Sequence, residues 1–300
     1  MVLERDWLSL EARRIALDND YLTHEMLLEE SRPDVAVEYI KRDFVFRPGL
    51  WRGTSQEPVW RRRIKKGSLV IGHSDLRTTC RDVLMIKILT GARVYCANLS
   101  CPDWFLKLSQ SHKLPLGLTN PTNESEFHAV FGDSSQISTV ARELVGSNPL
   151  TLYANFDQRT SPKKRAFLAE LCGSMPHIRV GTMDPTRTGR LRYLRDMRDT
   201  RLVICPEGNG MDTHRFWEAL YVGAIPVVLK NSYSAKLGSL LNLPYLPIES
   251  WGELASESHV VARGQEILAS RSFGLDAARG SHWKHLIFGS STSGKLEKEW

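Results

Sequence analysis

Residues 202–229 read Leu-Val-Ile-Cys-Pro-Glu-Gly-Asn-Gly-Met-Asp-Thr-His-Arg-Phe-Trp-Glu-Ala-Leu-Tyr-Val-Gly-Ala-Ile-Pro-Val-Val-Leu, and this stretch decides the fold. Its apolar ends, 202–205 and 225–229, are typical of strands that are buried on both faces. Between them, a loop with a proline and two glycines leads into a helix that Asp212 or Thr213 can cap. The helix has a predicted buried stripe at Phe216, Ala219, Leu220 and Gly223, and Gly223 also suits a left-handed C-cap. The stretch therefore predicts strand, loop, helix and strand, as in an α/β sheet.

The polar residues of this stretch suggest a ligand. Gly208 and Gly210 allow a ligand to approach the backbone, and a helix N-terminus attracts phosphate. His214 or Arg215 could neutralise a diphosphate. Glu218, one turn further into the helix, could accept hydrogen bonds from ribose hydroxyls. Together these residues suit a nucleotide diphosphate-sugar.

An alternative is that His214, Arg215 and Glu218 form only a solvated helix face with i,i+4 charge pairs. The glycine loop and the apolar strands on both sides favour the binding interpretation. In open α/β sheets, ligands bind where the carboxyl end of a strand meets the start of a helix.

Residues 205–228 resemble the donor-site motif of exostosin-like glycosyltransferases. Small algal and viral sugar transferases share this motif. The resemblance implies an α/β fold of the GT-B type, with two facing Rossmann-like domains and a C-terminal helix that crosses back to the first domain. It implies that the C-terminal domain binds the nucleotide sugar and that Glu218 contacts the ribose. The loop expected to hold the diphosphate contains Glu207, Gly208, Asn209, Gly210, Asp212, Thr213, His214 and Arg215.

A looser resemblance extends back to Leu150. Residues 150–154 read as a strand and 162–172 as a helix. In the resembling enzymes an Asn after this strand and an Arg in this helix lie near the donor, and Asn155 and Arg165 are the matching positions. For Arg165, together with Lys163 and Lys164 beside it, the alternative is an exposed basic surface.

The first half contains a predicted β-α-β unit, with a strand at 68–71, a helix at 78–89 and a strand at 91–97. His73 and Asp75 lie in the turn after the first of these strands and are the catalytic candidates. A carboxylate or imidazole there could take the proton of an acceptor hydroxyl in an inverting sugar transfer. In the alternative, Asp75 only caps the next segment and His73 is a turn residue.

The division into domains follows from the linker signal at 146–149. It predicts an N-terminal acceptor-side domain over 1–147, with a helical arm up to about residue 45, and a nucleotide-sugar domain over 148–300. A helix is expected from 134 to about 145, and the segment 281–300 is expected to cross back onto the first domain. The loop 115–125 could line the cleft.

The net charge is +6 and the pI is about 9.1. Such a balance fits a cleft for anionic donors, or nucleic acid. The basic run 61–66 reads as a solvated lead-in to a strand, with a contact to an acidic acceptor or nucleic acid as the alternative. A second set, at Arg192, Arg195, Arg198 and Arg201, could track a phosphate backbone, but its interleaved acids favour a salt-bridged face.

Composition limits the other classes of protein. No run of eighteen apolar residues is present and the first residues lack the apolar core of a signal peptide, so a soluble protein of the cytoplasm, or of a host cell's cytoplasm, is expected. The five cysteines include no Cys-x-x-Cys pair, which favours reduced thiols. The sequence shows no metal-ligand constellation, which predicts a metal-independent reaction.

Taken together, these patterns predict a glycosyltransferase that moves a sugar from a nucleotide sugar to a hydroxyl of a glycan or glycoprotein acceptor. UDP is the nucleotide that the resemblance implies, with no other cofactor. The alternative from another class is a basic module that binds a nucleotide or nucleic acid without catalysis.

Overall fold

The computed structural model describes residues 6–23, 26–27, 37–41, 69–73, 78–91, 93–119, 126–143, 150–270 and 272–288. The chain divides into two compact units, and each is described by itself. Unit 1 contains 1–23, 117–208 and 213–300, and unit 2 contains 24–116 and 209–212. The expected boundary lay between residues 147 and 148. The observed division differs from it, because the helices of 126–142 pack with the C-terminal half of the chain.

Unit 1 is built on a five-stranded sheet in which every neighbouring pair is parallel. The strands, in chain order, are β7 (Thr151–Ala154), β8 (Ile178–Val180), β9 (Arg201–Ile204), β10 (Ile225–Leu229) and β11 (Leu246–Ile248). Their order in the sheet is β11-β10-β9-β7-β8. The sequence prediction of a parallel α/β sheet is therefore confirmed, and unit 1 has the doubly wound strand order of flavodoxin-like folds.

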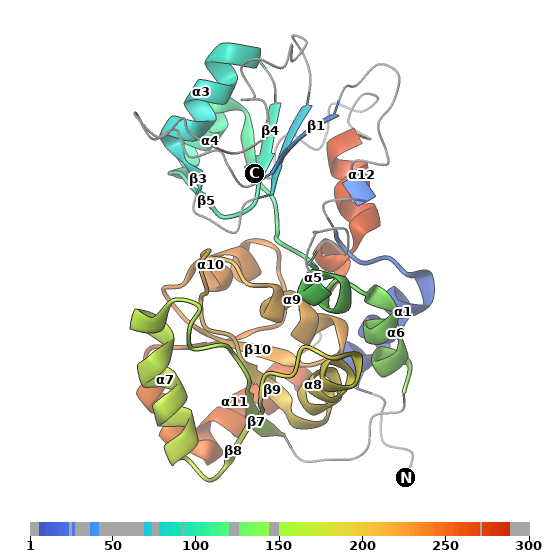
Figure 1. Cartoon of the computed structure of the whole chain (residues 1–300), viewed down its shortest axis with the longest axis vertical. Coiled ribbons are helices and arrows are strands. Elements are labelled where there is room, and N and C mark those ends of the chain that lie inside the picture. Colours follow the sequence, from blue (N-terminus) through green and yellow to red (C-terminus); the bar gives the residue numbers. More distant parts are fainter. Residues whose placement is uncertain are drawn as a thin grey trace. The chain divides into compact units, whose positions relative to one another are not determined.

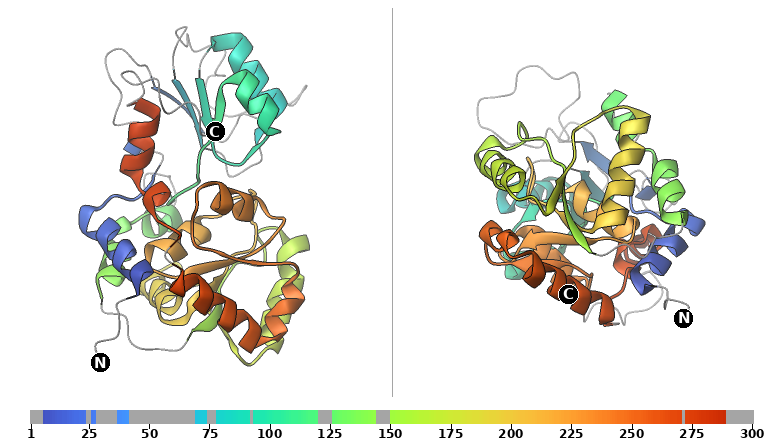
Figure 2. Two further views of the ribbon diagram at one scale, coloured as in Figure 1. Left: turned by 180° about the vertical axis from the view of Figure 1, so that it is seen from behind. Right: turned by 90° about the horizontal axis from the view of Figure 1, so that it is seen from below.

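The strand order reverses between β7 and β9. From β7 the chain moves outward to β8, and then crosses back to β9 on the other side of β7. Because parallel crossovers are right-handed, helices α7 (Pro162–Ser174) and α8 (Arg187–Thr200) must cover opposite faces of the sheet, as Figures 1 and 2 show. Such a reversal opens a crevice at the carboxyl ends of the two strands, which is the usual ligand site of these sheets.

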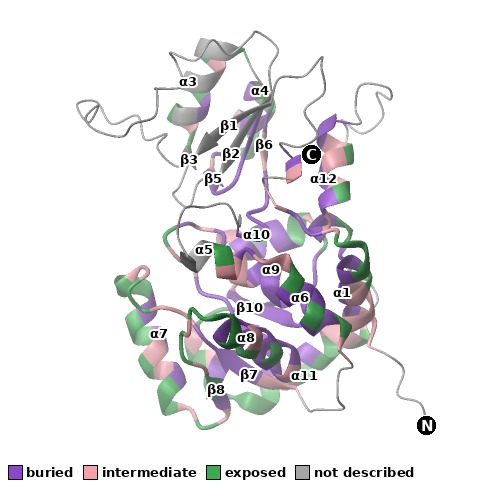
Figure 3. Cartoon of the chain, turned by 45° about the vertical axis from the view of Figure 1, so that its right-hand side comes forward, coloured by how far each residue is buried: buried purple, intermediate pink, exposed green. Residues whose placement is uncertain are grey.

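Helix α9 (His214–Tyr221) is the central helix of unit 1. Its predicted stripe is confirmed, since Phe216, Ala219 and Leu220 are fully buried and Gly223 follows with a φ of +79°. The opposite side is buried as well, including Trp217 and Tyr221 (Figure 3). Of the three residues in the solvated-face alternative, Glu218 is buried, whereas His214 and Arg215 are partly exposed, so the alternative is wrong for Glu218.

Further helices complete unit 1. Helices α1 (Trp7–Asp18), α6 (Ser134–Arg142), α8 and α9 pack against one another, and α5 (Glu126–Phe131) contacts α8. The remaining elements are α10 (Tyr233–Leu240), η2 (Trp251–Ala255), α11 (Glu257–Ala269), η3 (Asp276–Ala278) and α12 (Gly280–Phe288). The return of the C-terminal helix to the first domain stays a prediction, because α12 packs on η3 within unit 1 and residues 289–300 lie outside the described part.

Unit 2 contains a four-stranded sheet in the order β1-β2-β4-β6, again entirely parallel. The strands are β1 (Val37–Lys41), β2 (Leu69–His73), β4 (Arg93–Cys96) and β6 (Ser111–Lys113). The predicted β-α-β unit is confirmed by β2, α3 (Cys80–Thr90) and β4. The prediction of a helical arm up to residue 45 is correct for α1 but wrong for β1, where pairing with β2 overrides local propensity.

The core of unit 2 lies between the sheet and two helices. Val94 and Cys96 of β4 pack with Val83 of α3 and Leu106 of α4 (Asp103–Ser109) in one buried cluster. A short pair of strands, β3 (Thr78–Thr79) and β5 (Leu99–Ser100), flanks the helices. Since residues 94 and 96 face the same side of the sheet, α3 and α4 cover the same face.

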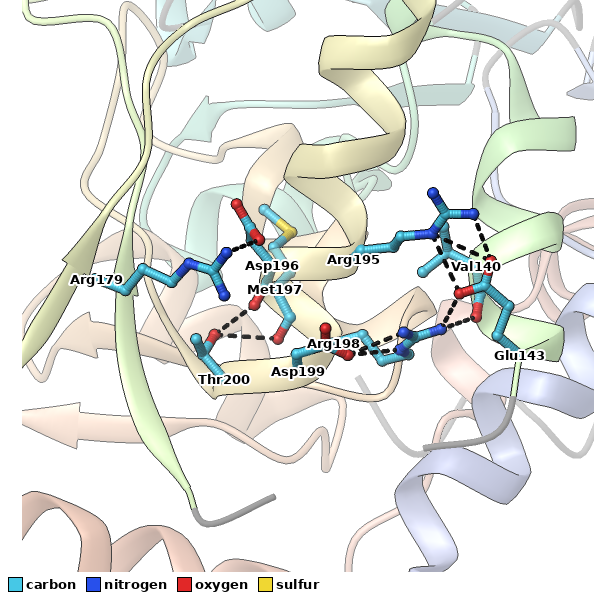
Figure 4. A network of polar contacts seen from close by, with 9 residues as sticks. All are labelled: Val140, Glu143, Arg179, Arg195, Asp196, Met197, Arg198, Asp199 and Thr200. Atoms are coloured by element: carbon cyan, nitrogen blue, oxygen red, sulfur yellow. Dashed lines mark hydrogen bonds and ion pairs between the residues drawn. The ribbon is translucent and has the colours of Figure 1, made fainter. Parts of the chain in front are cut away.

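Three of the four arginines in the predicted set form salt bridges, as predicted, although mostly with acids outside α8; Figure 4 shows Arg195 and Arg198. Arg195 and Arg198 both bind Glu143, at 2.7 and 2.5 Å, and Arg198 also binds Asp199. Arg201 pairs with Asp6. Because these guanidinium groups are already paired within the protein, they do not form a free stripe for a nucleic-acid backbone.

In the described part of the chain, no helix combines the length and the apolar character needed to cross a bilayer. The basic run 61–66, the linker 146–149 and the second half of the loop 115–125 lie outside the described residues.

Candidate functional site

Arg165 lies at the point where the strand order of unit 1 reverses. It extends from the first turn of α7 and donates hydrogen bonds to the carbonyls of Asp157, Pro206 and Glu207, at 3.2, 3.2 and 2.9 Å. Asp157 follows β7, and the other two residues follow β9. The guanidinium group therefore joins the segments that leave the two strands at the reversal, and Arg165 is 5% exposed.

Arg215, from the first turn of α9, lies near the same place. The ring of Phe156 lies near both guanidinium groups, with its centroid 5.8 Å from Cζ of Arg165 and 5.9 Å from Cζ of Arg215. Burial, followed by the charge of Arg215, lowers the pKa of Arg165 to about 10. Both arginines remain charged at neutral pH, so two cations are held close together.

Arg165 and Arg215 are called the arginine pair below. Among the described residues, neither guanidinium group forms an ion pair with a carboxylate, and the buried Nε of Arg215 has no hydrogen-bond acceptor. A buried charged donor without a partner is costly, so the arrangement favours an anion that bridges the pair.

The loop after β9 passes close to the arginine pair. A Cβ atom at Gly208 would lie 3.1 Å from Nη2 of Arg165, so a larger residue would push against the guanidinium group. Glu207 pairs through its side chain with Lys164 at 2.5 Å, and both side chains are partly exposed. Of the expected diphosphate loop, Glu207 and Gly208 lie beside Arg165.

Glu218 was expected on a helix face that is open to a ribose, but its side chain is buried. It is 3% exposed, and its two carboxylate oxygens accept hydrogen bonds from Arg190 at 2.7 Å and from the Tyr193 hydroxyl at 2.8 Å. Burial alone would raise the pKa of Glu218, but Arg190 and the two hydrogen bonds hold it below its usual value. The carboxylate is thus enclosed by α8 rather than presented on an open surface, and ribose binding by Glu218 stays a prediction.

The enclosed carboxylate lies close to the arginine pair. The hydroxyl of Tyr193 donates to Glu218, and both Tyr193 and Glu218 lie near enough to Arg215 to raise its pKa. Arg190 is fully buried, and its Cζ lies 4.7 Å from the ring centroid of Phe131 and 5.1 Å from that of Tyr193. The contacts of Arg190 and Tyr193 with Glu218 therefore form a buried polar network close to Arg215.

Asn155 follows β7 directly and is 4% exposed. Its Nδ2 donates to the Tyr153 hydroxyl at 2.9 Å and to the Thr182 carbonyl at 3.3 Å, while its Oδ1 has no donor among the described residues. Gly181 leaves room for this network, since a Cβ there would lie 2.4 Å from the Tyr153 hydroxyl. Asn155 thus lies at the carboxyl end of β7, where the strand order reverses, and its Oδ1 is still available as an acceptor.

For three other predicted donor residues, Asp212, Thr213 and His214, donor binding stays a prediction, and the structure shows the following about them. Asp212 does not cap α9: its Oδ2 accepts from Leu116 N at 2.9 Å, and its own N–H donates to Asn98 Oδ1. Thr213 occupies the N-cap position but makes no capping side-chain hydrogen bond. His214 donates from Nδ1 to the Gly117 carbonyl at 2.8 Å.

The expected diphosphate loop is divided between the two compact units. Asn209 and Gly210 group with Asp212 in unit 2, whereas the residues before and after them group with unit 1. The hydrogen bonds of Asp212 to unit 2 give the physical reason for this division.

The catalytic candidates belong to unit 2. His73 is the last residue of β2, at the carboxyl edge of the parallel sheet, as expected. Asp75 lies outside the described residues, so its position as the base stays a prediction.

Sequence reasoning missed three residues of the site, namely Phe156, Arg190 and Tyr193. Phe156 directly follows Asn155, so its place after a strand was visible. Arg190 and Tyr193 are three residues apart on α8 and so share a face. They were not identified, because the regular spacing of the arginines from 192 onward suggested a different face of the helix.

The described residues contain no group of three His, Cys, Asp or Glu side chains arranged to hold a metal ion. The sequence matches none of the protein-family models against which it was scanned, and no curated protein matches it either.

Proposed function

We propose that unit 1 binds a nucleotide sugar through its diphosphate and that the chain is a glycosyltransferase. One observation carries the proposal: two arginines that form no ion pair with a described carboxylate lie near the ring of Phe156, where the strand order reverses. A diphosphate supplies the charge that this pair lacks, and guanidinium groups match phosphate oxygens in geometry. The resemblance of residues 205–228 to the exostosin-like donor motif supports the same ligand and makes UDP the nucleotide of choice.

In this proposal the arginine pair stabilises the leaving diphosphate without a metal ion. When the bond between the sugar and the diphosphate breaks, negative charge develops on the leaving phosphate, and cations fixed beforehand stabilise that charge. The open acceptor of Asn155 suits a donor group of the nucleoside. The GT-B arrangement is part of the proposal: unit 2 would bind the glycan or glycoprotein acceptor and provide the base.

The test of the donor site is the variant Arg215→Gln. Losing a charged hydrogen bond to the diphosphate should weaken UDP binding about ten- to a hundredfold, as measured by calorimetric titration. Arg192→Gln is the matched control, because Arg192 is an exposed arginine of α8 and should leave the affinity unchanged. Equal UDP affinity in the Arg215 variant and the wild type would remove the arginine pair from the donor site.

A binding module without catalysis is the second candidate, and the net charge of +6 fits it as well as it fits an enzyme with an anionic donor. Binding of a nucleic-acid backbone to α8 is disfavoured, because Arg195 and Arg198 are already paired with Glu143. Hydrolysis of a UDP-sugar by the pure protein separates the two functions. An enzyme should release free sugar, even if slowly, whereas a binding module should release none.

A further inference from the structure

Helices α3 and α4 of unit 2 expose large apolar side chains. Leu84 and Ile88 of α3 are 46% and 69% exposed, and Trp104 and Leu108 of α4 are 67% and 78% exposed. Each pair is spaced i,i+4, so each helix presents one apolar stripe to solvent. The four residues are called the α3–α4 patch below.

The two stripes belong to one surface. Val83 and Leu106 point from the two helices into the same buried cluster on β4, and the helices contact each other. They also lie next to each other in Figures 1 and 2. Since both helices cover the same face of the sheet, their exposed side chains lie on the same outer side of unit 2.

Basic residues accompany the patch. Residues 80–109 contain four Lys or Arg and two Asp, which gives this segment a net charge of +2. Arg81 lies three residues before Leu84, and Lys107 lies next to Leu108; both are exposed and form no ion pair with a described residue. The acidic Asp103 is paired with Lys113 at 3.0 Å. An anionic partner is therefore favoured over a neutral or cationic one.

We propose that the α3–α4 patch docks unit 2 onto a membrane surface that contains anionic lipids. An indole ring, three aliphatic side chains and adjacent cations are the composition of helices that lie in the interface of a bilayer. Tryptophan prefers the headgroup level, leucine and isoleucine enter the acyl boundary, and lysine and arginine attract anionic headgroups. This docking does not depend on the proposed glycosyl transfer.

The test is flotation of the full-length protein with lipid vesicles. Vesicles of phosphatidylcholine with about one-third phosphatidylserine should carry the wild type upward, with much less binding to pure phosphatidylcholine or at high salt, because charge attraction is screened. The double variant Trp104→Ala/Leu108→Ser should bind at least about tenfold more weakly, since it removes the two most exposed apolar anchors of α4. Arg81→Glu/Lys107→Glu should reduce binding only to the anionic vesicles.

The matched control is Phe167→Ala in α7 of unit 1, an aromatic side chain that is 65% exposed and has Lys163 and Lys164 one turn before it. It should bind vesicles like the wild type. Vesicle binding that both the α4 double variant and Phe167→Ala leave unchanged would overturn the proposal. So would a wild type that binds no vesicles but forms dimers that the α4 double variant abolishes, because the patch would then join two copies of the chain.

Discussion

Glu218→Ala is expected to lower the free energy of unfolding by about 3–5 kcal/mol, as measured by denaturant titration. The variant removes the only carboxylate that pairs with Arg190 in the described part of the chain, and Arg190 is fully buried. It would leave an uncompensated cation between α8 and α9. The magnitude is that of breaking one side of a buried ion pair.

Two controls separate burial from charge. Glu207→Ala removes a partly exposed carboxylate from the ion pair with Lys164 and should cost less than about 1 kcal/mol. The double variant Glu218→Met/Arg190→Met should recover much of the loss, because no unpaired charge remains. If the unfolding free energy of Glu218→Ala lies within about 1 kcal/mol of the wild type, the enclosed ion pair is not what joins the two helices.

The same pair predicts the sign of a pH effect. Because the pKa of Glu218 is below its unfolded value of about 4.3, its contribution is complete above that pH and is lost as the pH falls through the lower folded pKa. The difference in unfolding free energy between the wild type and Glu218→Gln should therefore shrink below about pH 4.

Asp75→Asn should lower kcat by about 10²–10⁴ while donor affinity remains nearly unchanged. The change keeps the shape of the side chain and removes its basicity. The structure places His73 at the end of β2, and residue 75 follows two positions later. A base on unit 2 would take the proton of the acceptor hydroxyl in an inverting transfer.

His73→Ala is the control for Asp75→Asn, since it removes the other titratable group of the same turn. Normal turnover by the Asp75 variant together with collapse of the His73 variant would make the histidine the base. If both variants turn over normally, the base lies elsewhere, with the loop 119–128 as the next place to search.

The sequence was sufficient to predict the central strands and helix of unit 1. The apolar runs and glycines of 202–229 predicted β9, α9 and β10, because burial on both faces leaves a clear pattern. It was insufficient for β1, where five residues pair with a distant strand, and for the division into units, which depends on packing between α6 and α8. Long-range contacts of this kind leave no periodic signal.

The candidate site was only partly predictable, for a similar reason. Arg215 was named from its place at the start of a helix and Arg165 from the resemblance to the exostosin-like enzymes, and both lie at the reversal of the sheet. The enclosure of Glu218 was missed, because its partners Arg190 and Tyr193 lie 28 and 25 residues away in the chain. A charged residue opposite an apolar stripe looks exposed until the neighbouring helix is known.

The central claim is that unit 1 holds a nucleoside diphosphate between Arg165 and Arg215. Its most direct test is calorimetric titration of the wild-type protein with UDP and UMP in excess EDTA, with a single-stranded oligonucleotide as competitor. We predict one saturable site that survives the chelator, and UDP binding at least about tenfold tighter than UMP, because the second phosphate completes the pair. Equal affinities for UDP and UMP, or salt-sensitive oligonucleotide binding with no UDP site, would contradict the account.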